Sequence, residues 1–170
     1  IYRKLDDTTL EKIQTCFQKK TLRFLKLLKI FNRNRRLILS FDTTKEAFYG
    51  EVSKAEDKLY LHLGSIAKEP EHYYEFLTVA ITGNNGVKYI IDGRIIGQGC
   101  YMEDYVYQMV SYVKKHLNIE LMLFDRGFTS WGIIHKLMKL NMPYLIFWRK
   151  NGDWYEEHFR SMENSEFKEI

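Results

Sequence analysis

Two aspartates are the strongest candidates for chemistry, because each directly follows a short apolar run. Asp42 follows the run 37–41, and Asp125 follows the run 119–124. Such runs are typical of strands buried on both faces, and ligands bind at the carboxyl ends of strands in an open α/β sheet. If the two strands are neighbours, the carboxylates converge and repel each other unless a cation lies between them. Hard oxygen ligands favour Mg²⁺ or Mn²⁺. The alternative is that each aspartate caps the loop or helix that follows it.

The elements that must position these aspartates follow from hydrophobic periodicity and turn residues. The segment 43–70 has no clear pattern beyond a turn near Gly50 and an extended piece over 59–63. Up to residue 96 the pattern otherwise predicts a helix over 8–31, a strand over 37–41 and a hairpin of strands 73–82 and 87–96. Beyond residue 96 it predicts a helix over 102–117, a strand over 119–124, a helix over 130–140 and a strand over 143–148. Thr129 or Ser130 is the predicted N-cap of the helix over 130–140. This order predicts an α/β layer with helices packed on a mixed sheet.

The first predicted helix is strongly basic. Residues 1–36 contain eleven Lys and Arg and three acids, a net charge of +8, whereas the rest of the chain carries −4. An apolar stripe of the helix, expected to dock it on the core, consists of Ile13, Phe17, Phe24, Leu28 and Phe31. A different face carries Lys12, Lys19, Arg23 and Lys26, and Arg33, Arg35 and Arg36 follow. This basic face can contact DNA phosphates, or it can be the solvated side of a helix packed on the core.

Composition bounds the class of protein. With 170 residues, 45% hydrophobic and 28% charged, the chain is long enough for one folded domain and excludes a disordered tail. Its apolar runs are far shorter than the roughly 20 residues of a membrane-spanning helix, so we expect no membrane partner. Cys16 and Cys100 lie far apart and form no disulfide framework, which favours a reducing compartment such as the cytoplasm. Because the chain begins at Ile1 rather than Met, we expect it to be a fragment.

The surroundings of the two aspartates resemble a known family. The second lies in Asp125-Arg126-Gly127-Phe128, followed by a predicted helix and strand, and the first lies in Ser40-Phe41-Asp42-Thr43-Thr44. These patches, in this order, resemble the catalytic domain of insertion-sequence transposases of the DDE superfamily. In the IS-four-like branch, Asp-Arg-Gly-Phe follows the fourth strand of an RNase H-like fold. The resemblance covers roughly residues 36–150.

The resemblance implies a two-metal phosphoryl-transfer enzyme that acts on DNA. In that chemistry three carboxylates hold two Mg²⁺ or Mn²⁺ ions, water attacks a phosphodiester, and the freed 3′-hydroxyl attacks target DNA. By position Asp42 is the first carboxylate and Asp125 the second, while Arg126 meets a phosphate or pairs with an acid. The implied partner is double-stranded DNA, both the element ends and the target, in the nucleoid of a prokaryotic cell. A homodimer is left open.

The third carboxylate does not fit the family pattern. The glutamates after Trp148, namely Glu156, Glu157, Glu163 and Glu166, lack the Tyr, Arg and Lys companions at the family's spacing. We therefore expect residues 1–36 to form a basic helical segment, and residues 37–170 an RNase H-like catalytic domain truncated at its carboxyl end. Two alternatives remain: another RNase H-fold nuclease, and a non-catalytic DNA-binding relic of a transposase.

Overall fold

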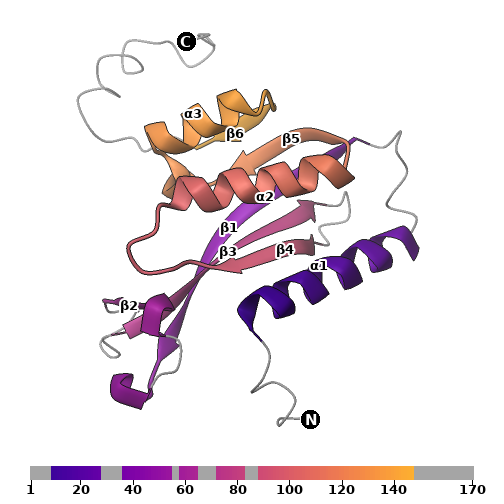
Figure 1. Ribbon diagram of the computed structural model, residues 1–170. Helices are drawn as coiled ribbons and strands as arrows, with labels where there is room; N and C mark the ends of the chain where they lie inside the picture. The colour runs from indigo at the N-terminus through magenta and orange to yellow at the C-terminus, as the bar shows by residue number, and fades with distance from the viewer. Residues whose placement is uncertain (1–8, 28–35, 55–57, 65–71, 83–87, 148–170) are drawn as a thin grey trace, which may run out of the picture.

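The computed structural model describes residues 9–27, 36–54, 58–64, 72–82 and 88–147, and Figure 1 gives their arrangement. Its helices are α1 (Leu10–Leu27), α2 (Met102–His116) and α3 (Trp131–Lys139), with short 3₁₀ turns η2 (Val52–Lys54), η3 (Lys58–Tyr60) and η4 (Arg126–Phe128). Its strands are β1 (Leu37–Phe48), β2 (Leu61–Leu63), β3 (His72–Thr82), β4 (Lys88–Ile95), β5 (Ile119–Phe124) and β6 (Tyr144–Ile146). The predicted elements are thus found in the predicted order.

All the strands belong to one mixed sheet. Its order is β2-β3-β1-β5-β6, and β4 pairs with β3 beside β2. The pairings of β3 with β1, β2 and β4 are antiparallel, whereas β1 with β5 and β5 with β6 are parallel. The last two pairs are parallel because α2 and α3 carry the chain back across the sheet between strands. This is the RNase H-like α/β arrangement that the sequence predicts.

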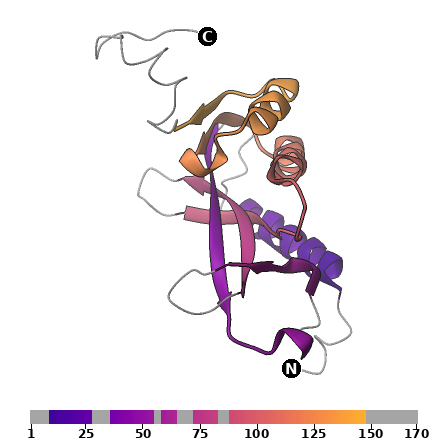
Figure 2. The same ribbon diagram turned by 90° about the vertical axis from the view of Figure 1, so that its left-hand side faces the viewer.

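The described helices all lie on one side of the sheet, as Figure 2 shows. Side chains of β1 alternate accordingly: Leu37, Leu39 and Phe41 are buried, whereas Ile38 and Asp42 are exposed. The buried residues join Met109 and Val113 of α2 in one core. The prediction that the strands 37–41 and 119–124 are buried on both faces is therefore wrong for the part of the chain that is described, because helices cover only one face.

Strand β1 is longer than predicted. The apolar run stops at Phe41, but the strand continues to Phe48 because β3 remains paired with it as far as His72. Asp42 accordingly lies within β1 rather than at its end. Asp125 does follow the last residue of its strand.

Local signals at the helix ends agree with the prediction. Ser130 is the N-cap of α3, and its hydroxyl accepts a hydrogen bond from Ile133 N at 3.2 Å. Two acidic residues lie in the first turn of α2 and basic residues in its last turn, which suits the helix macrodipole. None of the helices in the described ranges combines the length and hydrophobicity that a bilayer crossing requires.

Helix α1 docks through a different side from the one predicted. Ile13, Phe17 and Phe24 of the predicted stripe remain 43%, 40% and 51% exposed, whereas Leu25, outside the stripe, is completely buried in the core. Leu28 and Phe31 lie outside the described residues. On the docked side, Gln18 donates a hydrogen bond to the buried carboxylate of Asp92 at 3.0 Å.

Candidate metal site and basic helix

Strand register brings the two predicted aspartates to the same level of neighbouring strands. In the parallel pair β1–β5, Phe41 is aligned with Phe124, and each is followed directly by an aspartate. Their rings stack at 4.5 Å between centroids on the core side. Because successive side chains of extended chain alternate, Asp42 and Asp125 turn to the opposite side, and both are exposed.

Asp125 also has a local structural role. It is the N-cap of η4, where its Oδ1 accepts a hydrogen bond from Gly127 N at 2.7 Å. A Cβ on residue 127 would lie 2.9 Å from that oxygen, so a larger residue there would displace the Asp125 carboxylate. Asp42 has no such capping position inside β1, and its backbone carbonyl accepts a bond from Thr78 Oγ1 at 3.4 Å. The capping alternative therefore applies to Asp125 and not to Asp42.

The two aspartates offer part of the donor set that a hard cation requires. Two exposed carboxylates on adjacent strands offer oxygen ligands of the kind that Mg²⁺ and Mn²⁺ take. Within the described ranges no group of three metal-ligating side chains occurs. The glutamates considered as a third ligand, Glu156, Glu157, Glu163 and Glu166, lie outside those ranges, and Arg126 is exposed beside Asp125 in η4.

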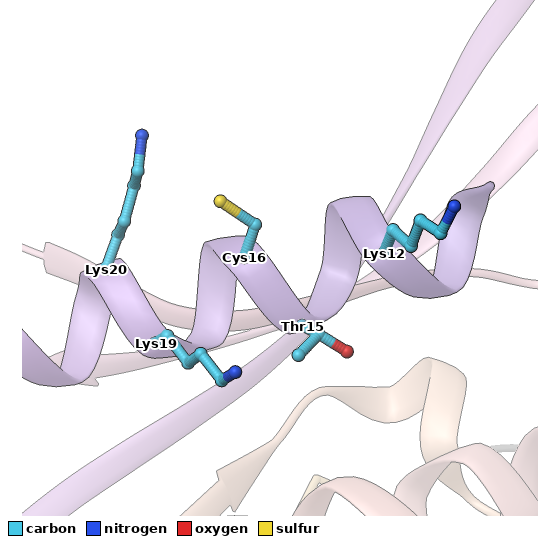
Figure 3. Close-up of a pocket in the computed structure, with 5 residues that line it drawn as sticks. All are labelled: Lys12, Thr15, Cys16, Lys19 and Lys20. Atoms are coloured by element: carbon cyan, nitrogen blue, oxygen red, sulfur yellow. The ribbon is translucent and has the colours of Figure 1, made fainter. Parts of the chain in front are cut away.

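The basic face of α1 is exposed as the sequence indicates. Lys12, Lys19, Arg23 and Lys26 all have exposed side chains, and Arg36 is exposed just before β1. Figure 3 shows the part of this surface around a shallow hollow of about 470 Å³, lined by Lys12, Thr15, Cys16, Lys19 and Lys20. Arg33 and Arg35 lie outside the described residues.

The basic helix and the aspartate pair are separate features of the surface. Helix α1 runs beside β4, as Figure 1 shows. Strand β3 lies between β4 and β1, so α1 is at the far edge of the sheet from β5. A single long ligand, rather than a small one, would be needed to reach both.

A buried polar cluster behind α1 was not predicted. Asp92 of β4 is completely buried, and its Oδ1 accepts hydrogen bonds from Gln18 Nε2 and from Gly93 N, each at 3.0 Å. Its Oδ2 lies 3.6 Å from Arg94 Nε, and Arg94 Nη1 donates to Gln108 Oε1 at 2.7 Å. The only signal in the sequence was an acid inside a β-branched run. The cluster joins α1, β4 and α2.

Burial near this cluster also affects Tyr112 of α2. Desolvation raises the pKa of its hydroxyl above the ordinary value, and the negative charge of Asp92 raises it further, while Arg94 acts in the opposite direction. Tyr112 is therefore a neutral side chain at physiological pH.

Comparison with known proteins gives matches only among solved structures. No family model and no curated protein matches the chain. It is similar to a piggyBac transposase synaptic complex with hairpin DNA, at TM-score 0.43 and 16% identity, over 75% of this chain and 26% of that one. It is also similar to the Mos1 mariner paired end complex with Mn, at TM-score 0.39 and 14% identity, over 81% and 44%.

A third match is a chain of the simian T-cell lymphotropic virus intasome in complex with PP2A regulatory subunit B56 gamma, at TM-score 0.39 and 13% identity, over 83% of this chain and 50% of that one. The chain thus spans between 26% and 50% of the length of these three structures.

Proposed function

We propose that this chain is part of the catalytic core of a DNA transposase of the insertion-sequence type, with Asp42 and Asp125 as two of its metal ligands. The supporting observation is the register of β1 with β5, which aligns Phe41 with Phe124 and so places an exposed carboxylate after each at the same level. The resemblance around Asp125-Arg126-Gly127-Phe128 supports the same assignment from sequence.

Each residue of the proposed site has a distinct role. A divalent ion, Mg²⁺ or Mn²⁺, would when bound activate the attacking oxygen and stabilise the leaving oxygen of a phosphodiester. The hydrogen bond from Gly127 N fixes one oxygen of Asp125, and we assign its other oxygen to the ion. We assign Arg126, beside it, to a DNA phosphate. The remaining phosphate contacts come from Lys19, Arg23, Lys26, Arg33, Arg35 and Arg36, whose attraction to DNA is independent of sequence.

Metal binding tests this proposal. Mn²⁺ is titrated into the chain and into its Asp42→Asn and Asp125→Asn variants, and the unbound ion is measured by electron paramagnetic resonance. Each variant is expected to weaken binding about tenfold or more, and the double variant little further, since both act on one site. Asparagine keeps the shape and, at residue 125, an oxygen that can accept from Gly127 N. Glu46→Gln is the matched control, because Glu46 is an exposed acid on the same strand.

Equal Mn²⁺ affinity in all of these proteins would reject the shared site. A second candidate function is a DNA-binding module without catalysis, which is favoured by the exposed basic face of α1. Nicking of supercoiled DNA separates the candidates. A nuclease or transposase core cuts in the presence of Mn²⁺ and fails to cut as Asp42→Asn, whereas a binding module retards DNA without cutting it.

A further inference from the structure

Helix α1 has two faces suited to packing, and the structure uses the more polar one. Ile13, Phe17 and Phe24 form the apolar face and remain 40–51% exposed. The face turned to the protein carries Gln14, Gln18, Thr21, Leu22 and Leu25, which are partly or fully buried. At about 100° per residue, these two faces lie roughly 90° apart around the helix axis.

The polar face is held by Asp92. Gln18 donates to this fully buried carboxylate, and Arg94, which is only 18% exposed, lies beside its other oxygen. Gln14, one turn before Gln18, has its amide nitrogen buried as well, without a hydrogen-bond partner in the described part of the chain. If α1 turned about its axis, Asp92 would lose the donor from Gln18 in a place that water does not reach. It would keep only Gly93 N and the nearby Arg94, and the loss of a hydrogen bond to a buried charge is unfavourable.

The apolar face of α1 borders a groove. This groove of about 330 Å³ lies beside the contact of α1 with the sheet, and its apolar lining is Leu10, Ile13 and Phe17 from the helix with Phe76, Ile90 and Ile95 from the strands. Ile90 is 52% exposed at this groove. Turning this face further into the groove would bury more of its apolar surface, while withdrawing Leu25 from the core.

We propose that Asp92 sets the rotation of α1 and so determines where its basic face points. A single buried polar contact that selects one packing arrangement over an apolar competitor is a recognised use of such residues. A turn of roughly 90° would swing Lys12, Lys19, Arg23 and Lys26 by the same angle relative to Asp42 and Asp125. Asp92 is a positioning residue, and its importance for DNA binding rests on the function proposed above.

Distances between spin labels test the rotation without DNA. In a Cys100→Ser background, one nitroxide is placed on Cys16 of α1, and a second on Lys115→Cys of α2 or on Glu46→Cys of β1, all of them exposed positions. Asp92→Leu is expected to shift the mean distance of at least one pair by about 5 Å or more, because a side chain about 5 Å from the helix axis is carried through a quarter turn. Asp92→Asn, which can still accept from Gln18, is expected to leave both distances unchanged.

A second variant guards against misfolding. Asp92→Leu leaves Arg94 without its carboxylate, so Asp92→Leu/Arg94→Met replaces the ion pair with apolar side chains, an exchange that proteins commonly tolerate. Unchanged spin-label distances in a folded leucine variant would overturn the proposal. A loss of helical circular dichroism would also overturn it, because α1 would then have unfolded from the sheet instead of rotating. Mn²⁺ binding is measured on the same proteins and is expected to stay at the wild-type level. Mn²⁺ binding therefore tests the metal site, and the spin-label distances test the rotation of α1, independently of each other.

Discussion

Phe41 and Phe124 stack across the junction of β1 and β5, with ring centroids 4.5 Å apart and ring planes inclined by 16°. They are the last aligned pair of the two parallel strands, and both are almost completely buried. Each directly precedes one of the two candidate metal ligands on the opposite side of the sheet. The contact thus couples packing of the core to the relative placement of Asp42 and Asp125.

Shortening one ring of this stack should affect both stability and metal binding. Phe124→Ala is expected to lower the free energy of unfolding by about 3–5 kcal/mol, since it opens a cavity in the core. Phe124→Leu keeps more volume and should cost less. In the folded leucine variant, Mn²⁺ affinity should fall although no carboxylate has been removed. Urea unfolding and Mn²⁺ titration are the two measurements.

Leu137→Ala provides the control for this prediction. Leu137 is fully buried in α3, and its loss should lower stability by about 2–5 kcal/mol. Leu137 does not belong to the aligned pair of Phe41 and Phe124, so the folded variant should bind Mn²⁺ as the wild type does. If Phe124→Leu behaved in the same way, the stack would have no influence on the aspartates.

Removing the hydroxyl from each of two tyrosines of α2 should have opposite effects on the free energy of unfolding. Tyr105 accepts a hydrogen bond from Gly97 N at 3.0 Å, and Tyr105→Phe should lower the free energy of unfolding by about 1 kcal/mol. The hydroxyl of Tyr112 is buried, and no hydrogen-bond partner for it occurs in the described part of the chain. Tyr112→Phe should therefore leave stability unchanged or raise it by about 1 kcal/mol. Denaturant unfolding at neutral pH compares them.

The same variants should also change how the stability of the protein depends on alkaline pH. Burial raises the pKa of both hydroxyls above the ordinary value of 10.0. The unfolded chain therefore releases these protons at lower pH than the folded chain, so their contribution to stability is complete below pH 10.0 and is lost as pH rises through the folded pKa values. Tyr112→Phe should make that loss shallower, whereas Tyr49→Phe, at an exposed position, should not.

Binding to duplex DNA should depend steeply on salt and little on sequence. The logarithm of the binding constant should fall linearly with the logarithm of salt concentration, with a slope of about −0.9 per phosphate contacted. Reversing two charges of the basic face, Arg23→Glu with Lys26→Glu, should weaken binding to every duplex and reduce the slope by about 2. Fluorescence anisotropy across a salt series measures both.

Lys115→Glu with Lys139→Glu makes the same charge change at exposed positions of α2 and α3. This pair should alter binding less than the α1 pair, because α1 concentrates the positive charge. DNA binding that ignores salt, or an equal effect of the two pairs, would count against a specific role for the basic helix.

The sequence alone was enough to locate most of the elements and to single out the two aspartates as candidates. Helix α2, the hairpin of β3 with β4 and the Ser130 cap of α3 depend on side-chain periodicity and on residues within a few positions of one another. Asp42 and Asp125 were recognisable because each ends an apolar run. These are local signals, and a linear pattern contains them in full.

Only the tertiary structure decided how those elements face one another. The alignment of Phe41 with Phe124 arises from pairing between distant strands, and β1 passes beyond Asp42 because β3 continues to pair with it. The docked face of α1 could not be found from its own wheel, since the most apolar side is not the buried one. Asp92, on a strand far along the chain, accepts a hydrogen bond from Gln18 on the docked face. Burial and register are properties of pairs of segments, so they are fixed only when the segments meet.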